Sequence, residues 1–392
     1  MILALPGAAR NRPKPLNVLC DLLSLAESNG VEGRLTEAIV ERSLPWKQFV
    51  DFATDQLLAP AVYRAFERHG LSKSAPSVVR RCLRSMYRLN RVRNAEIVSD
   101  CIAIAAELNK IGVRPVFFKG SGHLLTGFYD DPAMRIMSDI DILLPENRSG
   151  DCIERLISCG YCVDTLLRHP KDQTIAVLYS PSGGVSVDLH RSLLAYPYDG
   201  LLTPDEVIGH AVEHRREGAV FAVLSPTHQV LVNVGHAELH HNHSYIYGRL
   251  ALRALYDTAL AARRWNADLD WQHIANQFAR FGERTAFDFH FHAACELFGQ
   301  AAPPGFSPNL AARLYFKRAK IMSAHPVLIR ISDRPLRVAM LAAREFSDRD
   351  LRARLYRNMR DKLWWARHSA ALWRGGTAAA RAEDGYWNSR NP

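Results

Sequence analysis

Apolar residues recur every three or four positions at both ends of the chain, whereas the middle carries short apolar runs. From Leu16 to about Gly112 the spacing is helical, and it becomes helical again from about Leu201. Between these parts, the stretch Pro115 to Arg191 predicts strands separated by turns. We expect strands at 113–118, 138–144, 176–179 and 185–190, another beginning at Gly160-Tyr161, and a helix at 151–159. The turn residues at 180–184 should close a β-hairpin of the strands at 176–179 and 185–190.

This order of elements predicts an α+β fold in which a small mixed β-sheet core is embedded between N- and C-terminal α-helical regions. The expected divisions are a flexible arm at 1–14, a helical region at 15–112, the core at 113–192, a second helical region at 193–374 and a flexible tail at 375–392. Gly112 ends the first helical region and can supply a left-handed cap.

The composition is that of a globular protein, with 48% apolar and 23% charged residues. The N-terminal residues lack the features of a secretory signal, and no apolar run approaches the ~18 residues that cross a bilayer. We therefore expect a cytoplasmic protein. Its seven cysteines are an odd number scattered through helical patterns, which favours reduced thiols over a disulfide framework.

The net charge of +10 is concentrated near the C-terminus. Residues 313–374 contain 16 Lys and Arg against five Asp and Glu, so the rest of the chain is close to neutral. Such a segment is either a set of packed helices with charged outer faces or a surface for a membrane, a nucleic acid or an acidic partner.

The most informative chemistry lies in the predicted core. Asp139 and Asp141 alternate with Ile140 and Ile142, so both carboxylates project from one face of the strand. Two adjacent carboxylates repel each other, and Mg²⁺ is the cation that prefers such oxygen ligands together with phosphates. The pair is compatible with a metal site and also with the acidic face of an edge strand.

Asp188 adds a third carboxylate on a later strand, where Ser186, Asp188 and His190 share a face. If Asp188 lies next to the first pair, the three acids form the kind of two-metal site that phosphoryl or nucleotidyl transfer requires. The preceding turn, Lys119-Gly120-Ser121-Gly122, is either a structural turn or a backbone cradle for phosphate.

Four further patterns lie outside this core motif or at its edge. Arg80, Arg84, Arg88 and Arg91 form a stripe that is either a solvated face or a contact for a triphosphate or an acidic substrate. His236 and His240 have the spacing of a metal-binding pair, but a hydrogen-bonded or substrate-facing cluster is favoured. Cys159 and Cys162 have redox spacing without the expected preceding strand. Arg253 and Asp257 predict an intrahelical ion pair.

Taken together, Lys119-Gly120, Arg135, Asp139-Ile140-Asp141, Gly160-Tyr161 and Asp188-Leu189-His190 resemble the nucleotidyltransferase superfamily that shares the DNA polymerase β palm. The pattern is most similar to a poorly characterised bacterial family with a Lys-Gly…Arg…Asp-x-Asp…Asp-Leu-His signature. The resemblance covers residues 85–300. One departure is the spacing of seventeen residues between Ser121 and Asp139, which is longer than in compact antitoxin-type members.

The resemblance implies catalytic, metal-binding roles for Asp139, Asp141 and Asp188, with two Mg²⁺ ions as cofactors and an NTP as co-substrate. It implies nucleotide contacts from Lys119, Gly120, Ser121, Arg135 and Ser138. His190, His236, His240 and Arg88 are candidates for facing the substrate.

Members of the family occur beside genes for modified ribosomal peptides, including lasso peptides, and beside polysaccharide genes, so a peptide or a small molecule such as a sugar is the expected acceptor. Nucleic acid is less favoured. Two alternatives remain open. One is a non-catalytic, antitoxin-like binding module, and the other is a related phospho- or glycosyl-phosphate transferase.

Overall fold

The computed structural model describes residues 13–25, 30–41, 44–167, 169, 171–181, 183–240, 243–303 and 305–324. Most of the expected flexible arm, all of the expected tail and most of the arginine-rich segment lie outside these residues. The chain divides into two compact units. The sheet and the sites described below lie in the first unit, which runs to Tyr245 and includes Leu250–Lys317.

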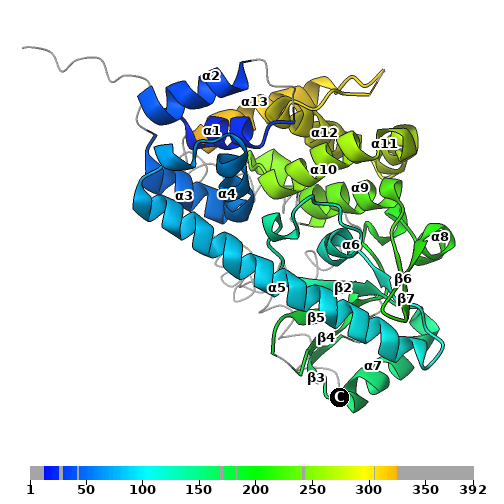
Figure 1. Cartoon of the computed structure of the whole chain (residues 1–392). Coiled ribbons are helices and arrows are strands. Elements are labelled where there is room, and N and C mark those ends of the chain that lie inside the picture. Colours follow the sequence, from blue (N-terminus) through cyan, green and yellow to red (C-terminus); the bar gives the residue numbers. More distant parts are fainter. Residues whose placement is uncertain are drawn as a thin grey trace, which may run out of the picture. The chain divides into compact units, whose positions relative to one another are not determined.

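The N-terminal region is helical, as the apolar spacing predicts. Its elements are α1 (Pro15–Leu22), α2 (Val31–Thr36), the π-helical turn η1 (Glu37–Glu41), α3 (Trp46–Asp55), α4 (Ala59–Arg68), the 3₁₀ turn η2 (Ser72–Ser74) and α5 (Ser77–Asn109). Helix α5 is long and runs from α3 and α4 along the sheet to α7 (Ser149–Ser158) (Figure 1). It ends before Gly112, whose φ of +74° is the left-handed conformation expected of a glycine cap.

The described residues form one seven-stranded mixed sheet with the order β3-β4-β5-β2-β1-β7-β6. The strands are β1 (Val116–Phe117), β2 (Asp139–Leu143), β3 (Cys162–Leu166), β4 (Thr174–Tyr179), β5 (Ser186–His190), β6 (Val212–Arg216) and β7 (Ala219–Val223). The pairs β2·β5 and β1·β7 are parallel, and the other neighbours are antiparallel. The mixed α+β fold class is therefore confirmed. The expected hairpin of β4 and β5 also forms.

The sheet extends beyond residue 192, where the sequence pattern indicated helices only. Strands β6 and β7 form a hairpin, and β7 pairs with β1. Glu217 and Gly218 have φ values of +52° and +82°, which is the backbone of a tight two-residue hairpin turn. The run Ala219–Val223 is apolar on both faces of the strand, so its periodicity does not distinguish a buried strand from a buried helix.

One face of the sheet packs against α5 and α7. Ile140, Ile142, Val187 and Leu189 from β2 and β5 belong to the same buried cluster as Ile104 and Leu108 from α5. Cys152 and Leu156 of α7 belong to the same cluster and pack against this face of the sheet. Because successive strand residues point to opposite faces, this packing directs Asp139, Asp141 and Asp188 to the other face.

The turns and short helices between the strands are α6 (Lys119–Leu125), η3 (Pro132–Met134) and η4 (Glu146–Arg148). The region after β5 contains η5 (Asp199–Leu201), α8 (Pro204–His210), α9 (Pro226–Gly235), η6 (His236–His240), η7 (Ser244–Tyr247), α10 (Leu252–Arg264), η8 (Asn266–Asp268), α11 (Trp271–Arg280), α12 (Arg284–Phe298) and α13 (Leu310–Ala324). Among the described residues, no helix combines the length and apolarity needed to cross a membrane.

Candidate functional site

Asp139, Asp141 and Asp188 lie side by side on the polar face of the sheet. The parallel pairing of β2 with β5 places Asp141 directly opposite Asp188 and Asp139 opposite Ser186. Asp139 and Asp188 are partly exposed, whereas Asp141 is buried. The tertiary structure therefore brings the third carboxylate beside the pair.

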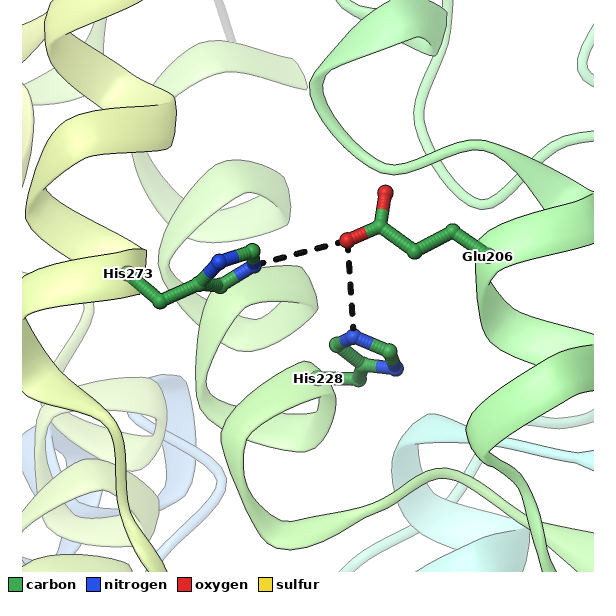
Figure 2. Close-up of side chains that lie close together, drawn as sticks. All are labelled: Glu206, His228 and His273. Atoms are coloured by element: carbon green, nitrogen blue, oxygen red, sulfur yellow. Dashed lines mark ion pairs between the residues drawn. The ribbon is translucent and has the colours of Figure 1, made fainter.

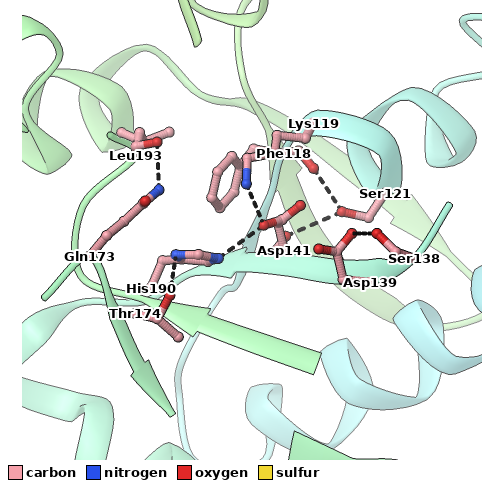
Figure 3. A network of polar contacts seen from close by, with 10 residues as sticks. All are labelled: Phe118, Lys119, Ser121, Ser138, Asp139, Asp141, Gln173, Thr174, His190 and Leu193. Atoms are coloured by element: carbon pink, nitrogen blue, oxygen red, sulfur yellow. Dashed lines mark hydrogen bonds and ion pairs between the residues drawn. The ribbon is translucent and has the colours of Figure 1, made fainter. Parts of the chain in front are cut away.

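Asp141 is held by two nitrogen atoms from different elements. Its Oδ1 accepts a hydrogen bond from Nζ of Lys119 at 2.8 Å and contacts Nε2 of His190 at 3.0 Å (Figure 3). Burial alone would raise the pKa of the Asp141 carboxyl, but Lys119 and His190 outweigh it and hold this pKa below its ordinary value. Asp141 is consequently a carboxylate at neutral pH.

His190 is buried beside Asp141. The residue is 3% exposed, its Nδ1 lies 3.4 Å from Oγ1 of Thr174, and its ring packs edge-on against Phe118. We expected it to face the substrate, but its two ring nitrogens are used inside the protein. The alternation along β5 gave the correct face and could not reveal this burial.

The carboxylate of Asp188 has one oxygen whose hydrogen-bonding capacity is not used. Its Oδ1 is buried and has no hydrogen-bond partner in the described part of the chain. Burial raises the pKa of the Asp188 carboxyl, and of its charged neighbours His190 opposes this rise while Asp139 and Asp141 add to it. An unpartnered buried oxygen beside two other carboxylates is the donor set that a hard divalent cation satisfies.

The three aspartates are neighbours, but their side chains are not arranged around a common point. Their carboxylate oxygens do not all lie within 4.8 Å of one another, and in the described residues the groups that meet this limit are Glu206, His228 and His273. Asp139 instead accepts a hydrogen bond from Oγ of Ser138 at 2.9 Å. Cation binding at the acids would therefore require side-chain rotations.

Lys119 begins α6 in a backbone conformation that L-residues seldom adopt. Its φ is +51°, in the left-handed region, and its side chain points to Asp141. Strained backbone of this kind persists only where the surrounding structure holds it in place. At this turn the Lys119 ammonium lies next to the Asp141 carboxylate.

Gly120 and Ser121 are packed into the protein. A Cβ on Gly120 would overlap Sδ of the buried Met137, so a larger residue here requires the Met137 side chain to move. Oγ of Ser121 is fully buried and donates to the carbonyl oxygens of Phe118 and Asp141, at 2.8 and 3.2 Å (Figure 3). The Ser121 hydroxyl therefore ties α6 to β2.

Arg135 is also placed differently from our expectation. Its buried guanidinium forms an ion pair with Asp257 of α10, with Nη2 and Oδ2 3.1 Å apart. Tyr129 donates a hydrogen bond to the other oxygen of Asp257. Arg253, which the spacing paired with Asp257, donates to the carbonyl of Ile136 at 3.2 Å instead. Residues distant in sequence thus replace the expected intrahelical pair.

The other predicted residues are spread over the molecule. Arg88 is exposed on α5. His236 and His240 stack on each other in the π-helical turn η6, with ring centroids 4.8 Å apart. Cys159 and Cys162 are free thiols, and Cys162 is exposed. Of the His236–His243 cluster, residues 241 and 242 lie outside the described part of the chain.

Sequence reasoning missed Asn90 and Asn94, two buried asparagines of α5. Both donate from Nδ2 to the carbonyl oxygen of Arg135, at 2.9 and 2.8 Å. They anchor the segment that leads into β2. Their i, i+4 spacing on an otherwise apolar helix face was a signal for such a contact, because buried amides require partners.

Comparison with known proteins identifies the family. A family model described as "Uncharacterised nucleotidyltransferase" matches residues 42–299. No curated protein matches the sequence.

Solved structures give remote similarity. The crystal structure of ANT(2")-Ia in complex with adenylyl-2"-tobramycin has a TM-score of 0.35 and 14% identity, over 47% of this chain and 98% of that one. The solution structure of ANT(2'')-Ia has a TM-score of 0.34 and 16% identity, over 51% of this chain and 98% of that one. The crystal structure of an antigenic nucleotidyltransferase-like protein from Paracoccidioides brasiliensis has a TM-score of 0.32 and 12% identity, over 53% of this chain and 93% of that one.

The matched region begins in the N-terminal helices and contains the sheet, all three aspartates and the helices through α12. The chain therefore belongs to this family of uncharacterised nucleotidyltransferases.

Proposed function

We propose that the chain transfers a nucleoside monophosphate from an NTP such as ATP to a hydroxyl or phosphate group of a peptide or small-molecule acceptor, for example a sugar, in a Mg²⁺-dependent reaction. The observation that carries this proposal is the register that puts Asp141 opposite Asp188 with Asp139 on the same face. Family membership supports the transfer of a nucleotide. The acceptor class rests on the sequence resemblance alone.

Asp139, Asp141 and Asp188 would hold the two Mg²⁺ ions. The unpartnered Oδ1 of Asp188 and the mutual repulsion of the acids support this assignment. When bound, Mg²⁺ neutralises triphosphate charge and makes the acceptor hydroxyl more acidic.

The residues around the acids would prepare the site. Lys119 would neutralise charge on the phosphates, because its ammonium already lies against Asp141 and is partly exposed. The raised pKa of Asp188 suits a group that accepts the acceptor's proton. His190 would orient Asp141, since its Nε2 contacts the same carboxylate oxygen as Lys119.

The backbone at Gly120 and Ser121 and the exposed hydroxyl of Ser138 are the remaining candidate nucleotide contacts. Arg135 would act as a positioning residue through Asp257. We assign the catalytic core to residues 113–223, because the hairpin of β6 and β7 completes the sheet.

The test is incubation of the protein with Mg²⁺, each of the four NTPs and candidate peptide or sugar acceptors, followed by mass analysis of the acceptor and measurement of pyrophosphate. Nucleotidyl transfer predicts release of pyrophosphate and an acceptor heavier by one nucleoside monophosphate. Release of nucleoside diphosphate with a phosphorylated acceptor indicates a phosphotransferase. A protein with no turnover and no Mg²⁺-dependent thermal stabilisation by NTPs is a non-catalytic binding module, and the proposal would then be wrong.

A further inference from the structure

A second group of potential ligands lies away from the three aspartates. Glu206 of α8, His228 of α9 and His273 of α11 converge, and their nearest donor atoms all lie within 4.8 Å of one another. Figure 2 shows the two imidazoles approaching one carboxylate oxygen from different helices. The separations from Oε1 of Glu206 are 3.8 Å to Nε2 of His228 and 3.5 Å to Nε2 of His273.

Each of the three residues occupies the same position in its helix. The preceding cap side chains, Thr203, Ser225 and Asp270, accept hydrogen bonds from the backbone N–H groups of Glu206, His228 and His273. Capping fixes the first turn of each helix, so the three side chains are presented from rigid backbone. A site built on fixed helix starts needs little reorganisation to bind an ion.

The spacing does not correspond to hydrogen bonding. Separations of 3.5 and 3.8 Å exceed the usual 2.7–3.2 Å of an N–H···O hydrogen bond. They are close to the distance between two ligands that each lie about 2.0–2.2 Å from one metal ion. The three groups are therefore spaced for a shared ion.

One buried nitrogen atom that faces Glu206 lacks a hydrogen-bond partner. It is Nε2 of His273, which has no such partner among the described residues. The side chain of His228 is only 6% exposed, and its Nε2 points toward Glu206. Burying a polar nitrogen atom without a partner costs free energy, and a bound ion would remove this cost for Nε2 of His273.

The donor set selects a class of metal. Two imidazoles and one carboxylate suit Zn²⁺ and neighbouring transition metals, whereas Mg²⁺ prefers oxygen ligands. The positive ends of the three helices oppose a cation, but the Glu206 carboxylate lies among them and offsets this effect.

We propose that Glu206, His228 and His273 bind one divalent transition-metal ion of the Zn²⁺ class and thereby join α8, α9 and α11. This site is separate from the aspartates and does not depend on the proposed nucleotidyl transfer. Three protein ligands leave one coordination position for water. Glu206 and His273 are partly exposed, at 27% and 34%, which gives an ion access from solvent.

The test uses the full chain, stripped of metal by a chelator and dialysed. We expect titration with ZnCl₂ to show one tight equivalent and to raise the thermal midpoint, and Co²⁺ to give the visible absorption of a low-coordinate site. His273→Gln and Glu206→Gln should each weaken Zn²⁺ binding at least tenfold and abolish the thermal shift. Circular dichroism establishes that each variant is folded, and two independent ligand variants guard against a folding defect in one.

Matched controls separate this site from other candidates. His214→Gln changes a half-buried histidine outside the cluster, and His240→Gln tests the stacked pair in η6. Asp139→Asn tests the candidate active site. All three should bind Zn²⁺ as the original chain does. The proposal is overturned if the original chain binds no Zn²⁺ at micromolar concentration, if both ligand variants bind it unchanged, or if binding is lost in a control.

Discussion

Asp141 and Asp188 occupy paired positions on adjacent parallel strands, 47 residues apart in sequence. Burial is the main cause of the raised pKa of Asp188, and the carboxylates of Asp139 and Asp141 add to it, whereas Lys119 and His190 hold the pKa of the buried Asp141 below its ordinary value. Their surroundings therefore shift the pKa values of these two neighbouring carboxyl groups in opposite directions, which is a common property of catalytic carboxylates.

Replacing Asp139 by Asn tests the metal assignment with the least disturbance of the fold, because Asp139 is partly exposed. We expect kcat/KM for nucleotidyl transfer to fall by on the order of 10³-fold or more, since a metal ligand contributes several kcal/mol of charge stabilisation. Steady-state pyrophosphate release measures this change. Asp164→Asn, an exposed acid on β3, is the matched control and should retain full activity. Equal activities in the two variants would contradict the assignment.

Lys119→Met should destabilise the fold as well as reduce activity. It leaves the buried Asp141 carboxylate with only His190, and we expect a loss of about 3 kcal/mol at pH 7.5. The lowered pKa of Asp141 contributes stability above the unfolded pKa of ~3.9, and this contribution is lost as pH falls through the folded pKa. The difference between variant and original chain should therefore shrink at pH 3.5, as measured by urea unfolding.

Lys110→Met is the control for that experiment. Lys110 pairs with Glu107 at 2.7 Å, but its side chain is 59% exposed, so we expect a loss below about 1 kcal/mol. A loss as large as that of Lys119→Met would show that burial is not the cause.

Mg²⁺ binding should weaken as pH falls. The proton competes with the cation for Asp188, and the raised pKa of this carboxyl makes the competition begin at a higher pH than for an ordinary aspartate. Without metal the sign reverses, because protonating Asp188 relieves the cost of its buried charge and adds stability as pH falls. Thermal midpoints with and without Mg²⁺ and a non-hydrolysable NTP, from pH 8 to pH 5, measure both effects. A Mg²⁺-induced shift independent of pH, or preserved in Asp188→Asn, would contradict them.

Asp257→Asn should lower the free energy of unfolding, and we expect this effect to be larger than any effect on nucleotide affinity. It leaves the buried Arg135 guanidinium without its countercharge, and we expect a loss of about 3–5 kcal/mol. Arg264→Met, which removes a partly exposed partner of Asp130, should cost far less. A folded Asp257→Asn protein with unchanged stability but a raised KM for NTP would favour a phosphate role for Arg135.

Gly120→Ala tests whether this glycine is required by packing. The new methyl group would overlap Sδ of Met137, and we expect a loss of about 1–3 kcal/mol in the free energy of unfolding that Met137→Ala partly reverses. Gly33→Ala in α2 is the matched control, because nothing lies near its Cβ and alanine favours the helix by about 1 kcal/mol. Failure of Met137→Ala to restore any stability would argue for a backbone requirement instead.

The sequence by itself determined the local elements and the chemistry of the core. Apolar periodicity gave the N-terminal helices, the hairpin of β4 and β5 and the shared face of Asp139 and Asp141, because these depend on neighbours along the chain. Gly112 was correctly expected to be left-handed for the same reason. The resemblance of its short motifs to nucleotidyltransferases also agrees with the family that the comparison identifies.

Only the tertiary structure decided which distant residues meet. The partner of Arg135 is Asp257, the ring of His190 turns inward to Asp141, and β7 joins the sheet beside β1. The cluster of Glu206, His228 and His273 arises because three capped helices begin at one place. Such contacts depend on long-range packing and on the desolvation of each group, and neither property is encoded in the spacing of residues along the chain.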